Sequence, residues 1–197
     1  MGVFLAPMAG VTDLPFRILA REYGADLGVS EMVSAQALLY DNQRTFKMLT
    51  IDPRERPVAI QLFGHDPQVM AQAARIVWEH VGPEMIDLNF GCPTPKIVKN
   101  GDGSALLRNP KLLGDIAKAT VEAVPIPVTA KIRIGWDAEN INCLEVARRL
   151  EENGVYWITV HGRTREQFYG GKADWEWIAR IKEASRIPIV GNGDVFS

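Results

Sequence analysis

Cys92 is the first candidate for chemistry, because it stands between a glycine and a proline after an apolar run, in IDLNFGCPTP (residues 86–95). Gly91 permits close approach of the backbone, and Pro93 favours an extended conformation at Cys92. Such a loop is typical of the mouth of a site, yet a free cysteine is often only a small buried hydrophobe. The pattern leaves both interpretations of Cys92 open, whereas Cys143, inside a helical pattern, is expected to be structural.

Polar side chains also follow the other apolar runs. Lys131 lies in PVTAKIRIG, and a cation there can reach water or meet a phosphate or an anionic ring; we favour the second role. His161 precedes Gly162 and Arg163 in the same kind of position, although a lone histidine is more often structural. Gln61 offers an amide that both donates and accepts. The turn GNGD (residues 191–194) suits either phosphate binding or a plain tight turn.

Basic and aromatic residues gather in the expected loops. Proteins bind single-stranded RNA with basic side chains that contact phosphates and aromatic side chains that stack on bases. For any single one of these residues, a place on a solvated loop surface is an equally simple explanation. The basic residues are Lys96, Lys99, Arg108, Arg133, Arg163, Arg165 and Lys172, and the aromatic ones are Phe168, Tyr169 and Trp175.

Composition and spacing exclude several classes of protein. The 197 residues are 47% hydrophobic and 23% charged with a net charge of -2, which is ordinary for a soluble domain and shows no overall basic balance. No apolar run approaches a membrane span, no leader is expected at the start, and two distant cysteines predict neither a disulfide framework nor zinc. No metal site and no Ser-His-Asp arrangement is expected, and a reducing, cytoplasmic setting is the default. Ser104 is expected to cap a short helix.

Short apolar runs alternate with longer amphipathic stretches along the chain. The runs predict strands buried on both faces, because they are continuous; they are Val3–Ala6, Leu27–Val29, Val58–Leu62, Met85–Leu88, Val128–Ile132, Trp157–Val160 and Ile187–Val190. The stretches predict helices at Asp66–Val81, Pro110–Ala123, Asn140–Asn153 and Asp174–Ser185. Asp66-Pro67 and Asn109-Pro110 are typical helix starts.

Seven strand-then-helix units predict an α/β fold with a parallel sheet, either an open doubly wound sheet or a (β/α)8 TIM barrel. Nearly every strand delivers a polar side chain at its carboxyl end. In a barrel all strand ends ring one site, whereas an open sheet gathers ligand groups at one switch point. The distribution favours the barrel. Seven strands in residues 1–197 indicate a single catalytic domain, truncated after strand seven.

Five ordered motifs together resemble the tRNA-dihydrouridine synthases, with the bacterial B-type branch most similar. They are APMAGVTDLPFR (residues 6–17), DLNFGCP (87–93), AKIRIGW (130–136), VHGRTREQFYGGKADW (160–175) and GNGDV (191–195). The resemblance spans essentially the whole chain. It implies an FMN-dependent TIM-barrel enzyme that reduces selected uridines of tRNA, with NADPH reloading the flavin.

The resemblance also implies roles for the motif residues. Cys92 would protonate the pyrimidine after hydride transfer, and a thiol suits this because it is mostly protonated at neutral pH. Flavin would be held by Pro7, Met8, Ala9, Gln61, Lys131, His161, Asn192, Gly193 and Asp194. The uracil would be faced by Asn89, Lys131, His161 and Arg163.

The resemblance implies an eighth strand that carries a phosphate-binding loop and a helical domain that grips tRNA after strand seven, and we expect residues 1–197 to be a fragment without them. Two alternatives therefore stay open. One is another FMN barrel, such as a dihydroorotate dehydrogenase relative that acts on a free pyrimidine. The other is a flavin-poor, inactive fragment that folds or self-associates through its open strand edges.

Overall fold

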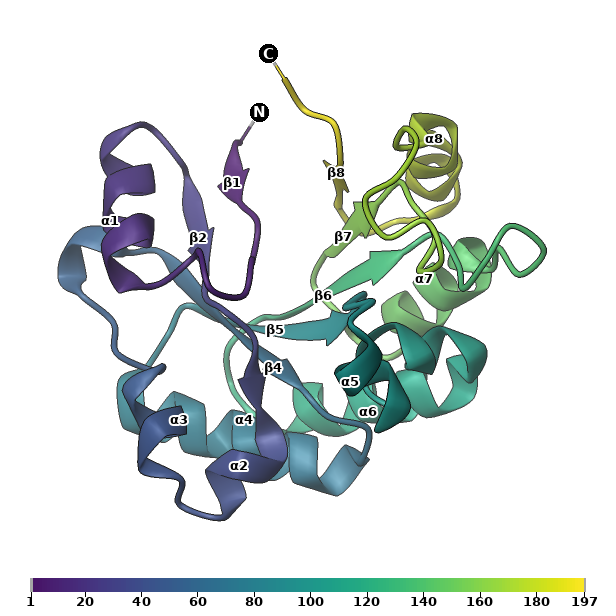
Figure 1. The fold of residues 1–197 in the computed structure, drawn as a ribbon. Coiled ribbons are helices and arrows are strands. Elements are labelled where there is room, and N and C mark those ends of the chain that lie inside the picture. Colours follow the sequence, from purple (N-terminus) through teal and green to yellow (C-terminus); the bar gives the residue numbers. More distant parts are fainter. Residues whose placement is uncertain (1, 197) are drawn as a thin grey trace.

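One parallel sheet forms the centre of the computed structural model, which describes residues 2–196 (Figure 1). The strand order is β1-β2-β4-β5-β6-β7-β8, and β3 pairs with β4 off this path. The strands are β1 (Phe4–Leu5), β2 (Leu27–Val29), β3 (Val33–Ser34), β4 (Val58–Phe63), β5 (Met85–Phe90), β6 (Val128–Arg133), β7 (Ile158–His161) and β8 (Ile189–Asn192). All seven predicted strands are confirmed.

The extra strand β3 shares one position in the sheet with β2. Strand β2 pairs with the start of β4 (Gly28↔Val58), and β3 pairs with its end (Val33↔Leu62). Ser30 interrupts them, because its Oγ accepts the backbone N–H of Gln61 at 3.0 Å in place of a backbone carbonyl. The sheet therefore has seven strand positions, and the break directs the chain toward the carboxyl end of the sheet.

Helices cover the outer face of the sheet. The longer ones are α1 (Leu14–Glu22), α4 (Pro67–Val81), α6 (Pro110–Ala123), α7 (Cys143–Glu152) and α8 (Trp175–Ala184). The shorter ones are α2 (Ala35–Leu39), α3 (Gln43–Lys47) and α5 (Pro95–Lys99), with 3₁₀ turns η1 (Pro53–Glu55) and η2 (Gly103–Arg108). The four predicted helices are confirmed as α4, α6, α7 and α8. Asp66 and Asn109 cap α4 and α6 as predicted, by accepting backbone N–H groups of the first turn.

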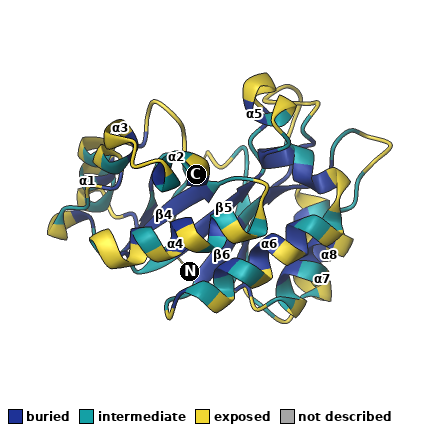
Figure 2. Cartoon of the chain, turned by 90° about the horizontal axis from the view of Figure 1, so that it is seen from below, coloured by how far each residue is buried: buried dark blue, intermediate teal, exposed yellow. Residues whose placement is uncertain are grey.

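The hydrophobic core lies between the sheet and these helices, whose outer sides are exposed (Figure 2). On β5, Ile86, Leu88 and Phe90 are fully buried in this core, while the alternate residues Asp87 and Asn89 are buried polar groups of the opposite, inner face. Strands β6 and β7 follow the same rule, whereas on β4 Gln61 is the one buried polar residue and its inner-face neighbour Ala59 is apolar. The prediction of burial on both faces is confirmed for the central strands β4, β5, β6 and β7, but it is wrong for β1 and β8, which are only partly buried at the two ends of the sheet. The inner faces of β5, β6 and β7 are mainly polar rather than continuously apolar.

The sheet has two ends, because β1 and β8 each pair with one neighbour and not with each other in the part of the chain described. Figure 1 shows β1 and β8 facing each other at the top of the view, as the two ends of the curved sheet. Seven parallel strand positions with outer helices correspond to seven of the eight positions of a (β/α)8 barrel. None of the described helices has the length and apolar character needed to cross a membrane.

Candidate functional site

A cavity of about 460 Å³ opens at the carboxyl ends of the strands, and it brings together every residue predicted to bind cofactor or substrate. These lining residues are Pro7, Met8, Ala9, Gln61, Asn89, Cys92, Lys131, His161, Arg163, Asn192, Gly193 and Asp194. They come from β1, β4, β5, β6, β7, β8 and the segments that directly follow them. The parallel arrangement accounts for this convergence, because all carboxyl ends meet at one edge.

Cys92 lies in this cavity, partly exposed, with its Sγ 3.4 Å from Thr94 Oγ1. Its carbonyl oxygen accepts both the Ser104 hydroxyl (2.9 Å) and the Ser104 backbone N–H (3.1 Å). Gly103 makes this contact possible, since it has φ +60° and a Cβ there would lie 2.8 Å from the Cys92 oxygen. The prediction that Ser104 caps a helix is wrong: the turn begins at Gly103, and Ser104 instead holds the Cys92 loop.

Lys131 reaches across the sheet from β6, and its Nζ donates to Asn192 Oδ1 at 3.0 Å. Burial and, to a smaller extent, the charge of Arg133 lower the pKa of Lys131 to about 8, while Asp87 opposes the shift. A lysine with this pKa still carries its charge at neutral pH. Its charge is therefore available in the cavity with only a neutral amide directly bonded to it.

His161 is held neutral among three cations. Burial, followed by the charges of Lys131, Arg133 and Arg163, lowers the pKa of His161 to about 3. Its Nε2 lies 3.4 Å from Nη1 of Arg163, and because a guanidinium can only donate, Nε2 must accept. The imidazole then carries its single proton on Nδ1.

The GNGD turn is fixed by Arg163. Its Nη2 donates to both carboxylate oxygens of Asp194, at 2.8 and 2.9 Å. The Ala173 backbone N–H and this guanidinium hold the pKa of Asp194 below its ordinary value. Gly193 has φ +111°, and a Cβ there would lie 2.9 Å from the His161 ring. The turn is thus packed tightly against the histidine.

Two of the basic residues predicted to contact RNA are buried and hold loops of the protein, although both line the cavity. Arg133 and Arg163 are only 3% and 6% exposed. Arg133 donates to the carbonyl oxygens of Gly91, Thr164 and Phe168, and Arg163 donates to those of Gly170 and Gly171. Their guanidinium groups therefore build the loops around the cavity. Lys96, Lys99, Arg108 and Lys172 are exposed, as an RNA contact requires.

Asp87 and Thr129 are functional candidates that the sequence analysis missed. Both lie on the inner face directly below the cavity, with Thr129 Oγ1 donating to Asp87 Oδ1 at 2.6 Å. Burial raises the pKa of Asp87, while hydrogen bonds from Thr129 and Gln61 and the charge of Lys131 oppose this. The available signal was a carboxylate in the middle of the apolar strand MIDLNF.

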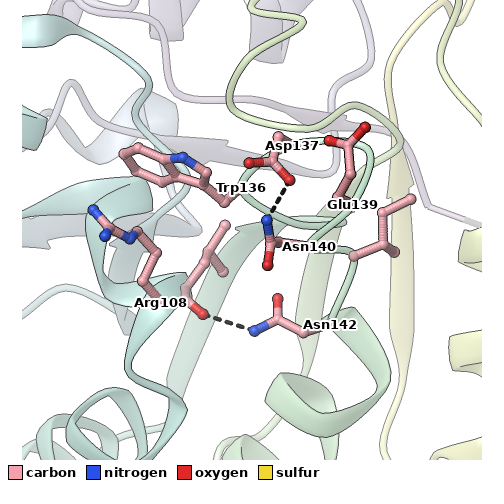
Figure 3. A pocket seen from close by; sticks show the side chains of 8 residues that line it. Arg108, Trp136, Asp137, Glu139, Asn140 and Asn142 are labelled. Carbon is pink, nitrogen blue, oxygen red and sulfur yellow. Dashed lines mark hydrogen bonds between the residues drawn. The ribbon is translucent and has the colours of Figure 1, made fainter.

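A second cavity, of about 630 Å³, is separate from the cavity at the strand ends and lies between η2 and the loop after β6 (Figure 3). The guanidinium groups of Arg108 and Arg165 lie 4.9 and 4.7 Å from the Trp136 ring centroid. Asn142 Nδ2 donates to the Leu107 carbonyl at 2.7 Å (Figure 3). This cavity contains none of the residues predicted to act on a flavin or a pyrimidine. No group of three or more metal-ligating side chains occurs among residues 2–196.

Sequence comparisons place the chain among known proteins. The family profile described as dihydrouridine synthase matches residues 4–197. A Rickettsia bellii protein named "Probable tRNA-dihydrouridine synthase" is 46% identical over 98% of this chain and 59% of its own length. The "tRNA-dihydrouridine synthase B" of Pseudomonas aeruginosa is 46% identical over 99% of this chain and 58% of its own. The predicted resemblance is confirmed, and the chain spans about three fifths of the length of these relatives.

A fold comparison finds a solved structure with a similar fold. The crystal structure of a Burkholderia cenocepacia protein superposes with a TM-score of 0.65 at 15% sequence identity, over 100% of this chain and 71% of that chain. At this identity the match concerns the fold alone.

Proposed function

Because the chain belongs to the dihydrouridine synthase family, we propose that it forms the catalytic part of an FMN-dependent enzyme that reduces uridines of tRNA to 5,6-dihydrouridine with NADPH. The observation that carries the proposal is the convergence of Cys92, Lys131 and His161 on one cavity from three different strand ends. The proposal includes a cytoplasmic location, where tRNA substrates and a reducing environment occur together.

The residues around the cavity fit an anionic flavin nucleotide. Lys131 and Arg133 place two cations at the site, and among the described residues that line the cavity Asp194, which is paired with Arg163, is the one carboxylate, with Asp87 buried beneath. A site with surplus positive charge favours an anionic ligand.

We propose that residues on several walls of this cavity bind FMN. Pro7, Met8 and Ala9, directly after β1, provide an apolar wall, and Gln61 and Lys131 provide donors for the ring system. His161, Asn192, Gly193 and Asp194 would lie toward the ribityl and phosphate groups. When bound, the flavin supplies the hydride, which NADPH renews. The protein's task is to orient the cofactor and to manage protons and charge.

Cys92 would hold the proton that the pyrimidine takes up at C5. A protonated thiol can donate its proton directly to the pyrimidine. Among the described residues, Thr94 Oγ1 is the only hydrogen-bond partner of the Cys92 Sγ atom. Lys131 and Arg163 lie on the same cavity, where positive charge stabilises negative charge that develops on a carbonyl oxygen of the base. Asn89 and His161 complete the polar surface toward the uracil.

The tRNA would reach this cavity from the carboxyl face of the sheet. A uridine in a folded RNA must leave its stack to enter such a site. Phe168 and Tyr169 line the cavity with ring centroids 5.2 Å apart, and both rings are exposed and able to stack on a base.

The test uses the full-length protein with FMN, NADPH and tRNA that lacks dihydrouridine. We expect dihydrouridine in the tRNA and a bound chromophore that absorbs near ~450 nm, as oxidised flavins do. Cys92→Ala should retain the chromophore and form product roughly 10²–10⁴-fold more slowly. Absence of both flavin and product in the wild-type protein would overturn the proposal, and reduction of a free pyrimidine without tRNA would favour the dihydroorotate dehydrogenase type of activity.

The open edges of β1 and β8 support a second, non-catalytic possibility for residues 1–197 alone. Unpaired parallel strands offer backbone donors and acceptors to another strand. Either a further segment of the whole protein or a second copy of the chain could pair there. Light scattering on residues 1–197 and on the full-length protein distinguishes these two ways of covering the edges. If a further segment normally pairs with β1 and β8, only the shorter chain should form dimers, and these should contain little flavin.

A further inference from the structure

Four buried side chains form an unbroken chain of hydrogen bonds beneath the cavity. Thr129 Oγ1 and Gln61 Nε2 donate to the two carboxylate oxygens of Asp87, at 2.6 and 2.7 Å. Asn89 Nδ2 donates to Gln61 Oε1 at 2.8 Å, and Asn89 Oδ1 accepts the Cys92 backbone N–H at 2.9 Å. We call Thr129, Asp87, Gln61 and Asn89 the Asp87 network; each is at most 8% exposed.

The direction of every bond in this network is determined by its two ends. A carboxylate can only accept, so Gln61 must present its Nε2 to Asp87 and its Oε1 to Asn89. A backbone N–H can only donate, so Asn89 must present its Oδ1 to Cys92. The two amides therefore have one consistent orientation, and the remaining donor and acceptor positions of Gln61 are fixed with it.

We propose that Asp87 is a positioning residue, which fixes the amide orientations of Gln61 and Asn89 and, through Asn89, the backbone of the Cys92 loop. The catalytic consequence rests on the proposed function, in which Gln61 bonds the cofactor and Cys92 holds a proton. The geometry links those two sides of the cavity through one buried carboxylate. An unpaired carboxylate is costly in the interior, which is why both oxygens of Asp87 have donors.

The main experiment replaces Asp87 by Asn, which keeps the shape but turns one acceptor into a donor. Amide hydrogen exchange is measured at Cys92 and Gly91, with Leu88 of the same strand as the internal reference for global unfolding. We expect exchange at Cys92 to accelerate about tenfold more than at Leu88, as expected for the loss of a buried hydrogen bond. The side-chain amide resonances of Gln61 and Asn89 should shift in the same variant.

A matched pair of isosteric variants provides the second test and the control. Thr129→Val removes one donor to Asp87, and Thr120→Val removes a hydroxyl that donates to the Ile116 carbonyl, at an equally buried site in α6. Thr129→Val should shift the Gln61 side-chain resonances, and Thr120→Val should not. This pair decides the question if Asp87→Asn does not fold.

The turnover measurement connects the network to catalysis. In the full-length enzyme, Asp87→Asn should lower kcat by about tenfold or more with little change in KM for tRNA, because only the positions of reacting groups change. Equal acceleration of exchange at Cys92 and Leu88, or unmoved Gln61 resonances, would overturn the positioning role. These resonance measurements need neither flavin nor tRNA, so they stand or fall separately from the proposed function.

Discussion

The two faces of the same sheet have opposite chemistry and opposite tasks. On β6, Val128, Ala130 and Ile132 are fully or almost fully buried in the core against the helices. Thr129, Lys131 and Arg133 alternate with them on the inner face, and two of these three carry charge. Alternation along a strand separates the sets automatically, since successive side chains point to opposite faces.

This difference indicates that one face supplies stability and the other holds function at some cost in stability. The outer face buries apolar area, which stabilises the fold. The inner face buries ionisable side chains, namely Asp87, Lys131, Arg133 and His161. Burial shifts the pKa of each in the direction that favours its neutral form. Apolar substitutions on the outer face should therefore change mainly the free energy of unfolding, whereas substitutions on the inner face should change the chemistry of the site and, where a buried charge loses or gains a partner, stability as well.

The largest expected effect is on turnover, at Cys92. Cys92→Ala removes the proposed proton donor, and a general acid contributes roughly 10²–10⁴-fold to rate. The free energy of unfolding should change little, because the side chain is partly exposed. Dihydrouridine formation per flavin-loaded enzyme and urea denaturation measure the two quantities.

Cys143 provides the matched control on the outer side, because it is fully buried in the core at the start of α7. Cys143→Ala should cost about 1–3 kcal/mol of stability by leaving a small cavity, with kcat/KM unchanged. The proposed division between the faces fails if Cys143→Ala abolishes turnover in folded protein, or if Cys92→Ala lowers stability markedly and leaves turnover of the folded protein unchanged.

The next effect is on stability, at Leu88. This side chain is fully buried among the apolar residues of the outer face. Leu88→Ala should lower the free energy of unfolding by about 2–5 kcal/mol, because it removes apolar contacts and leaves a cavity. Denaturant unfolding measures the loss. Flavin affinity of the folded variant should remain within about twofold, and a larger loss would show that the outer face also shapes the site.

A smaller effect with a distinct pH signature is expected at Lys131. Its pKa is about 8 in the folded protein against an ordinary 10.5, so between those values the unfolded chain binds a proton that the folded chain has released. Wild-type stability therefore rises with pH through this window. Below this pH window the buried charge of Lys131 destabilises the folded protein by its full amount, on the order of 3 kcal/mol at most.

Lys131→Met should remove this destabilisation. The variant should be more stable than the wild type at pH 7, although the loss of the hydrogen bond to Asn192 reduces the difference. The difference should shrink as the pH approaches 10.5, where the wild-type lysine is neutral in both states. The measurement is the difference in unfolding free energy between the two proteins across this range. A pH-independent difference would contradict the assigned pKa, and flavin affinity should fall in the same variant because the cation is gone.

The long elements of the fold were predictable, because their signals are local. Continuous apolar runs predicted all seven strand positions, and Asp66 and Asn109 marked two helix starts. The pattern also held a signal for α1 that was not used: Asp13 caps it and Pro15 lies in its first turn. The five-residue helices and β3 were not predictable, because segments this short depend on tertiary contacts.

The site was predictable where strand ends carry it. Parallel strands bring their carboxyl ends together, so Gln61, Lys131 and His161 could be placed around one cavity before their contacts were known. Charge alone could not separate Arg133, which is buried and bonds loop carbonyls, from the exposed Lys96. Asp87 was missed because it lies within a strand rather than at its end.

The smallest expected effect compares one substitution on the two sides of the sheet. Thr129 and Thr120 are 1% and 0% exposed, and each hydroxyl donates one hydrogen bond. Thr120→Val leaves the Ile116 carbonyl its helical hydrogen bond, so it should cost less than about 1 kcal/mol. Thr129→Val leaves a buried carboxylate oxygen of Asp87 without a donor, and should cost about 1–3 kcal/mol.

Thermal and urea unfolding of both variants at neutral pH measure this difference. Lowering the pH should narrow it, because protonation of Asp87, whose pKa burial has raised, removes the charge that needs the missing donor. Equal costs at all pH values would mean that the carboxylate does not depend on Thr129, and that the polar inner face is as tolerant of an apolar side chain as the helix-covered core.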